Sequence, residues 1–323
     1  MNIATGAGPS LSSLTAATGN SGSSVILGGG ALTGSFLQTS TNATTDAESQ
    51  TNGQTAPYNG VVGIQTQAVA NSQSFGATDS SIATATTQSN GSTVTANGGV
   101  VLENVQQSGA FSAVGAGNDL TSVGQGQSSG TLSVDQTNTG QTTQGAMFVN
   151  LGNSEITETD ATATGNNINA SNAGGPLSLT DSQDNESFVH AQSVETSYEF
   201  GGATVTADGV GNAAFAGNVS GSTTVNNTQV NGAEGVESTA SFTSAGSPGY
   251  DVAVSSTATG NAVTGFACSE CEGGVMTATS SQTNLGDIAA SSQVGLASGA
   301  RSVRGVATAV GNTATFYTSS TGN

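Results

Sequence analysis

Cysteine and histidine, the side chains most specific for metal or redox sites, occur only three times in this chain. Cys268 and Cys271 form a Cys-x-x-Cys element, which occurs in zinc sites and redox centres. A zinc site takes four ligands, and the sequence supplies neither a second cysteine pair nor a nearby histidine. We therefore expect a disulfide between Cys268 and Cys271 that closes a local turn and suits an oxidising exterior.

The other candidate groups for chemistry are isolated from one another. The segment 115–121, GAGNDLT, resembles a calcium-binding turn of repeat toxins, but it occurs once, so no column of metal sites is expected. His190 is the sole histidine and has no serine or cysteine motif of a hydrolase around it. Acidic residues are plentiful, but no repeat concentrates them as a pair for glycan hydrolysis. We predict a protein that is not an enzyme and that has no metal or cofactor.

The only cationic side chains are Arg301 and Arg304, set against 21 acidic residues, and the net charge is −19. Nucleic acid is excluded as a partner, and an anionic lipid surface is disfavoured, because both need clustered cations. One interpretation of the arginines is that they balance acidic neighbours at one end of the molecule. The other is a docking contact with carboxylates of a partner protein or an acidic polysaccharide.

A recurring phrase, Ala/Gly-x-Gly/Ala-Asn, indicates which elements hold these residues. Its seven copies are separated by 51, 47, 48, 46, 49 and 51 residues. Such a period predicts one structural unit stacked on copies of itself. We interpret the phrase as a corner, where glycine permits close approach and asparagine tolerates left-handed backbone. The corner asparagines are Asn20, Asn71, Asn118, Asn166, Asn212, Asn261 and Asn312.

A second phrase, Gln-x-Asn, lies near the middle of each period at the end of a strictly alternating segment. Leu132, Val134, Gln136 and Asn138, for example, share one face of a strand. Stacking would place these amides above one another, so that they form hydrogen-bonded ladders. Ser40–Asn42 is interpreted as a weaker first copy. The predicted ladder residues are Gln88, Asn90, Gln136, Asn138, Gln183, Asn185, Gln229, Asn231, Gln282 and Asn284.

The composition, with 34% hydrophobic residues, 4% aromatic residues and 47 glycines, leaves little apolar surface for a globular core. An all-β solenoid can hold such a sequence, because each coil pairs its backbone with the coils above and below. We predict about six repeats of about 48 residues, with two coils per repeat because each period divides near 20 and 28 residues. A β-propeller is the alternative. Residues 1–14 are expected to be an N-terminal leader segment, and residues 15–323 a single solenoid domain.

Several repeats resemble those of a known family. The segments 257–263, 280–284 and 307–314 are similar to repeats of the holdfast-anchor surface proteins of stalked bacteria, in particular the large, secreted, repeat-rich member. This resemblance implies a protein at the outer membrane that joins the cell body to an adhesive polysaccharide, together with companion envelope anchor proteins.

The periodicity by itself favours a non-enzymatic, extracellular rod whose polar faces bind sugars. The open end coils would also accept a strand from another protein or another copy of the chain. Two alternatives stay open: a self-assembling surface filament or surface-layer component, and a polysaccharide-processing enzyme on a β-helix. The sequence contains no stretch of transmembrane length, and its start lacks the pattern of a secretory signal. We expect a location at the bacterial cell surface, associated with the outer membrane.

Overall fold

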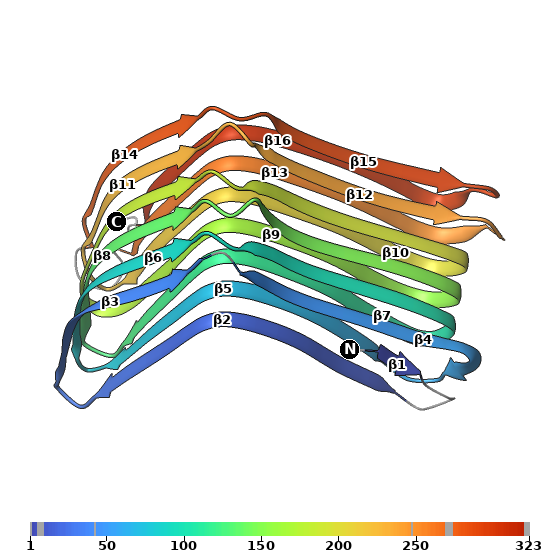
Figure 1. Ribbon diagram of the computed structural model, residues 1–323, viewed down its shortest axis with the longest axis horizontal. Coiled ribbons are helices and arrows are strands. Elements are labelled where there is room, and N and C mark those ends of the chain that lie inside the picture. The colour runs from blue at the N-terminus through green and yellow to red at the C-terminus, as the bar shows by residue number, and fades with distance from the viewer. Residues whose placement is uncertain (1, 5–9, 42, 247, 269–273, 320–323) are drawn as a thin grey trace.

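In the computed structural model the chain forms a single stack of β-coils (Figure 1). The structure describes residues 2–4, 10–41, 43–246, 248–268 and 274–319, and within them it contains strands, turns and bends but no helix. The strands are β1 (Asn2–Ala4), β2 (Leu11–Leu27), β3 (Ala31–Ser40), β4 (Thr44–Tyr58), β5 (Val62–Thr78), β6 (Ser81–Asn90), β7 (Thr93–Gln125), β8 (Ser128–Asn138), β9 (Thr142–Asn185), β10 (Phe188–Val219), β11 (Thr223–Asn231), β12 (Val236–Ser244), β13 (Gly249–Cys268), β14 (Met276–Asn284), β15 (Ile288–Leu296) and β16 (Ala300–Ser319). The all-β solenoid prediction is confirmed.

Each strand pairs in parallel with the strand one whole repeat away. Asn20 of β2 pairs with Asn71 of β5, which pairs in turn with Asn118 of β7. Because the offset between paired strands is a full period, each repeat forms one coil. The expectation of two coils per repeat is therefore wrong: the two parts of a period face each other across the interior of one coil. A propeller is also excluded, since its blades would not pair in parallel along one stack.

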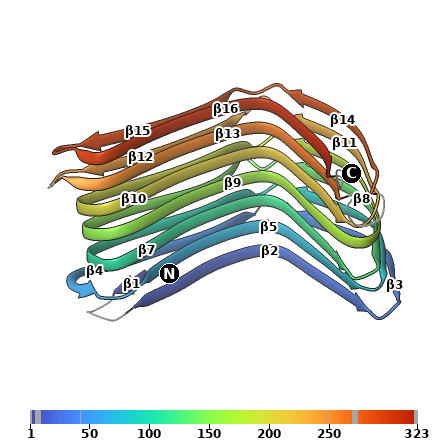
Figure 2. The same cartoon turned by 180° about the vertical axis from the view of Figure 1, so that it is seen from behind.

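A coil consists of three segments, which we name by their role. The long segment runs through the corner asparagine, as in β5; the Gln-x-Asn segment follows, as in β6; and the return segment, residues 93–105 of β7, leads to the next coil. In Figures 1 and 2 the long segments form one layer, bent at its middle, and the other two segments form the opposite layer. Residues 1–14, the expected leader, include β1, which pairs with β4, and the start of β2.

The bend of the long segment depends on a shift in the alternation of side chains. In β13, Val252 and Ala258 point inward before the bend. Residues 258–261 are all buried, so the alternation shifts by one residue there, and Asn261 and Val263 point inward after it. Strict alternation predicts Asn261 on the face opposite Val252, and this prediction is wrong. The strand changes phase at the glycine before the asparagine, and the pairing between coils skips that glycine.

Six of the seven corners have glycine at this position, with Ala70 as the exception, and Gly211 shows one reason, because two other groups occupy the space of a side chain there. A Cβ atom on Gly211 would lie 2.3 Å from Oδ1 of Asn231 and 2.5 Å from the carbonyl oxygen of Gly260. The expected left-handed backbone at the corner asparagines is wrong. Among the described residues, the non-glycine positions with positive φ are Asp79 and Ser220, both in turns.

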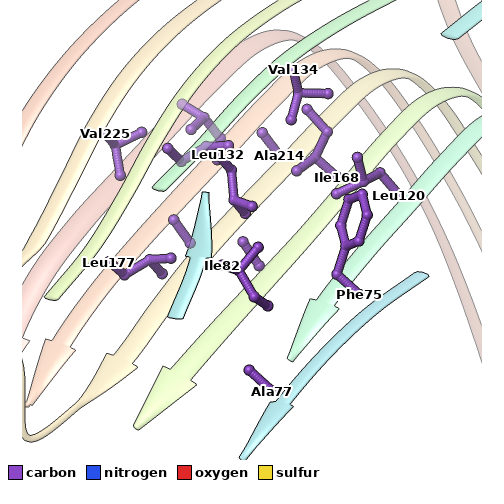
Figure 3. Packing of buried hydrophobic residues seen from close by; sticks show 14 residues of the cluster. Phe75, Ala77, Ile82, Leu120, Leu132, Val134, Ile168, Leu177, Ala214 and Val225 are labelled. Carbon is purple, nitrogen blue, oxygen red and sulfur yellow. The ribbon is translucent and has the colours of Figure 1, made fainter. Parts of the chain in front are cut away.

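The interior holds narrow apolar columns on both sides of the bend. Beyond the bend, the column of Leu120, Ile168 and Ala214 in the long segments faces the column of Leu132 and Leu179 in the Gln-x-Asn segments (Figure 3). Before the bend, Phe111, Met147 and similar residues fill the space between the long and return segments. Each fully buried Leu, Ile or Phe contributes about 1.5–3 kcal/mol. The limited apolar content is thus concentrated where the two layers meet.

Candidate functional site

The glutamines of the Gln-x-Asn phrase form one buried column. Nε2 of Gln136 donates to Oε1 of Gln88 at 2.7 Å, and Nε2 of Gln183 donates to Oε1 of Gln136 at 2.8 Å. The same bond joins Gln229 to Gln183 and Gln282 to Gln229. The column begins at Gln38, which accepts from Gln88 at 2.8 Å.

The first copy of the Gln-x-Asn phrase is therefore displaced from the position expected. Gln38 pairs with Gln88 and Ser40 pairs with Asn90, so the first copy is 38–40. The assignment to Ser40–Asn42 is wrong, and Asn42 itself lies outside the described residues.

The asparagines of the same phrase form a second column beside the glutamines. Nδ2 of Asn90 donates to Oδ1 of Asn138 at 2.8 Å, and the chain of bonds continues through Asn185 and Asn231 to Asn284. Four of these asparagines, Asn138, Asn185, Asn231 and Asn284, occupy the space that the corner glycines leave open. Their side chains thus fix the inner side of the bend.

The corner asparagines form a third column, which runs from Asn20 to Asn312. Each Nδ2 donates to the next Oδ1 at 2.7–2.8 Å. Each of the six donors also bonds across the coil, as Asn71 does to the carbonyl oxygen of Ser89 at 3.0 Å. The corner column therefore joins adjacent coils to one another and joins the two layers within a coil.

The two arginines are placed differently from one another. Nε of Arg301 donates to Oδ1 of Asp251 at 3.1 Å, and its terminal NH2 group contacts Oδ2 of the same carboxylate. This bidentate bond holds the pKa of Asp251 below its ordinary value. The guanidinium carbon also lies 5.5 Å from the centre of the Tyr250 ring. Arg301 therefore already has a carboxylate partner one coil below, whereas Arg304 lines the outer face beside Ala253 and Ser255.

Tyr250 and Arg301 belong to a surface depression, which we call the corner groove, at the junction of return and long segments. It consists of two hollows of about 630 and 550 Å³ that share Glu155, Gly201 and Tyr250. The first hollow extends to Arg301, and the second extends to Asn104. Because the shared residues belong to both linings, the hollows form one groove that crosses several coils.

Two glycines keep this groove open. Gly202 pairs with Ile156 in the coil below and with Asp251 in the coil above, and it leaves a gap between their outward side chains. At Gly201, a Cβ atom would lie 2.3 Å from the carbonyl oxygen of Glu155. Tyr250 stands beside this gap with 63% of its surface exposed. The groove thus combines an exposed ring with carboxylates and amides.

The outer face beside the groove carries Glu158, Asp160 and Asp208 together with Arg304. Glu158 and Arg304 lie in one outward column, with Thr204 and Ala253 between them. Burial, followed by repulsion from Glu158 and Asp208, raises the pKa of Asp160 to about 6. Like charges are therefore crowded on this face.

The remaining candidate residues are not brought together. Burial lowers the pKa of His190, whose ring stacks on Phe188 at 5.7 Å. Burial raises the pKa of Asp119, and Nδ2 of Asn167 donates to its Oδ1 at 2.7 Å. Within the described ranges, no cluster of three or more His, Cys, Asp or Glu side chains could hold a metal ion.

The predicted disulfide falls at the edge of what the structure describes. Cys268 ends β13, and its Sγ accepts a hydrogen bond from Oγ of Ser319 at 3.5 Å. Cys271 lies outside the described residues. The Cys268–Cys271 disulfide therefore stays a prediction.

Comparison with known proteins places this architecture in a family. A family model described as holdfast attachment protein D matches residues 1–235. The chain belongs to this family. The prediction of a holdfast-anchor protein is thereby confirmed at the level of the family, whereas the large, repeat-rich member stays a prediction. No curated protein and no solved structure matches the chain. The family match includes the amide columns as far as Asn231, whereas Tyr250 and both arginines lie beyond it.

Membership of this family implies a role in holdfast attachment. Sequence reasoning missed the corner groove, because its residues are 46–51 positions apart and meet only through the coil register. It also missed Glu195, a buried carboxyl in the return segment. The alternation Val189, Ala191, Ser193, Glu195 could have located it at an inward position. In the described part of the chain, no helix could cross a membrane.

Proposed function

We propose that this chain is a non-enzymatic, extracellular structural protein that anchors an adhesive polysaccharide, the holdfast, to the bacterial cell envelope. Membership of the holdfast attachment protein D family carries the proposal. The location is the cell surface, in association with the outer membrane, and companion envelope anchor proteins are the partners there. Strand addition at the outer edge of β2 or of β16 is a physical route to such a partner.

The architecture supports a role in transmitting force. Three columns of amide hydrogen bonds join the coils along the stack, in addition to the parallel backbone pairing. A polymer held at several coils at once would bind with an avidity much greater than that of any single contact. A rod of this kind needs no reaction centre to retain an adhesive.

The proposal is tested by deletion of the gene in a cell that makes the adhesive. We expect adhesive polysaccharide to be synthesised at the normal level but released into the medium, and retention to return when the wild-type gene is restored. Polysaccharide that stays at the cell pole of the deletion strain would contradict the proposal.

A self-assembling surface filament is the second candidate, and the distribution of charge favours it. The end strands β2 and β3, and β14, β15 and β16, contain no acidic residue, so these edges can approach other copies with little local like-charge repulsion. Sedimentation velocity of the purified chain over a hundredfold range of concentration tests this candidate. Growth of rods with concentration supports it, and one constant monomeric species rules it out.

A further inference from the structure

We propose that the last described coil binds a β-strand of another protein chain that carries a Gln-x-Asn phrase. The strand lies parallel to β14, at the position that a seventh Gln-x-Asn segment would take. The proposal deepens the strand-addition route to companion anchor proteins given above and rests on it. It assigns the edge, the direction of the strand and two of its side chains.

The described residues contain one more long segment than Gln-x-Asn segments. The corner column has seven members, Asn20 to Asn312, joined by six bonds. The glutamine column has six members, Gln38 to Gln282, joined by five bonds. Within the described part of the chain, β14 pairs with β11 alone. The long segment in β16 therefore lacks the Gln-x-Asn segment that follows each of the other six.

The corner glycine of β16 has empty space where other corner glycines meet an asparagine. A Cβ atom on Gly211 or Gly260 would lie 2.3 or 2.5 Å from Oδ1 of the asparagine in the following Gln-x-Asn segment. At Gly311 the nearest contact is Nδ2 of Asn284, at 3.8 Å, and Asn284 belongs to the preceding segment. The space that an incoming asparagine would fill is therefore open.

The amides of β14 match the two amides of an incoming Gln-x-Asn phrase. Oε1 of Gln282 has no donor among the described residues, whereas Oε1 of Gln229 accepts from Gln282 at 2.7 Å. Nδ2 of Asn284 donates to the carbonyl oxygen of Gly286, which leaves its second N–H available. An incoming glutamine can therefore donate to Gln282, and its asparagine can accept from Asn284, in the directions that the columns already have.

The last corner asparagine matches the backbone of the same strand. In an internal coil, Nδ2 of Asn212 donates to the carbonyl oxygen of Val230, the residue between the glutamine and the asparagine. Asn312 has no such carbonyl in its own coil, and its Nδ2 donates to Gln282 of the preceding segment at 3.4 Å. The incoming strand would supply the missing carbonyl, and its backbone would extend the parallel pairing of β14.

The apolar interior is also uncovered at this edge. Ala278 is exposed, although Val225 at the paired position one coil below is buried. The same holds for Ala314 and Val263. β14 contains no charged residue, so charge does not keep an incoming strand away. The opposite end of the stack fits less well, because Ser40 stands there at the position of the asparagine.

The experiment is fluorescence anisotropy of the full chain with a labelled peptide of residues 223–231, TTVNNTQVN. One control peptide has the reversed sequence, and the other carries Gln229→Leu and Asn231→Leu. We expect the parent peptide to bind about tenfold more tightly than either control, because only it can make both the parallel pairing and the amide bonds. Equal binding of the reversed peptide would overturn the proposal, and so would the absence of binding.

Two variants of the protein locate the binding at β14. Gly311→Ala fills the space for the incoming asparagine without meeting any atom closer than 3.8 Å, and Gln282→Leu removes the acceptor for the glutamine. Each should weaken peptide binding about tenfold. Gly295→Ala is the matched control in the last coil, because its Cβ would contact only Thr243, at 3.7 Å, in the return layer. Unchanged binding in both edge variants would place the peptide elsewhere and overturn the proposal.

Failure of this proposal is distinguishable from failure of the anchoring function. If the peptide does not bind, the strand site is wrong, even where gene deletion still releases adhesive. If gene deletion leaves the adhesive attached to the cell, the anchoring function itself is wrong, whatever the peptide titrations give.

Discussion

At the scale of single residues, Glu195 shows how one buried carboxyl makes stability depend on pH. It lies at an inward position between Val149 and Phe242 of the adjacent coils. Burial raises its pKa to about 7, although hydroxyl hydrogen bonds from Thr157 at 2.6 Å and Thr159 at 2.7 Å oppose this shift. Because its pKa in the folded state exceeds the ordinary value near 4.5, the folded protein binds more protons than the unfolded chain between these limits.

We therefore expect the free energy of unfolding to fall as pH rises from about 4.5 to about 7, with about 3 kcal/mol of the loss due to Glu195. Urea denaturation across this range measures it. Glu195→Gln should remove this part of the slope, and Glu103→Gln, at an exposed position, should not. Asp181, another buried acid with a pKa raised to about 7, should keep a residual slope in the Glu195 variant. An unchanged slope in Glu195→Gln would contradict the assignment.

The corner glycines give a second prediction at the residue scale. Gly211→Ala would place a Cβ against Oδ1 of Asn231 and the carbonyl oxygen of Gly260, so either the ladder or the backbone must move. We expect a loss of about 1–3 kcal/mol in thermal or urea unfolding. Gly202→Ala, in a strand with open space, is the control and should cost less than 1 kcal/mol. Equal losses would mean that the corner has no special steric requirement.

At the scale of elements, the amide columns have opposite directions. The glutamine donors point toward the preceding coil, whereas both asparagine columns donate toward the following coil. Each amide within the three columns, apart from their end members, therefore bonds to the coils on both sides, and its loss affects groups above and below. This arrangement links neighbouring coils more firmly than their apolar contacts alone.

Gln136→Leu tests the cost of breaking a column. The change leaves Oε1 of Gln88 and the carbonyl oxygen of Asn167 without this donor, and Nε2 of Gln183 keeps only its bond to the carbonyl oxygen of Ala213. At about 1–3 kcal/mol for an unsatisfied buried group, we expect a loss of about 2–4 kcal/mol in urea denaturation. Gln282→Leu, in the half-exposed last member of the column, should cost less than 1 kcal/mol. Similar losses at both positions would show that burial of the column contributes little.

The elements also show which parts of the fold could be read from sequence. The spacing of the corner asparagines gives the register directly, because residues one period apart pair with each other. The spacing alone could not distinguish two coils per period, in which the two parts stack on one another, from one coil, in which they face one another. Both arrangements have the same period. The phase shift at Gly260 hides the inward position of Asn261 from an alternation rule. The groove was not predictable, since it forms only where side chains of successive coils meet.

At the scale of the whole molecule, the stack behaves as a one-dimensional array in which each coil contacts only its neighbours. Stability in such arrays is close to a sum of terms for single units and for their interfaces. The length of the stack should then change only by whole coils of one period each. If each period held two coils, removal of half a period would also be tolerated.

Deletion of residues 167–212 tests the coil assignment for the whole molecule. It joins Asn166 to Ala213, the residue that normally follows the equivalent Asn212, so the register of every remaining strand is preserved. We expect cooperative unfolding, an unchanged β-type circular dichroism spectrum per residue, and a rod shorter by about 5 Å in small-angle scattering. Deletion of residues 167–189, half as many, removes both the long segment after the bend and the Gln-x-Asn segment of one coil. It should abolish cooperative unfolding, because the coils on either side lose their pairing partners over that half of the stack. If the half-period deletion folds as well as the full one, each period holds two independent coils and the register described here is wrong.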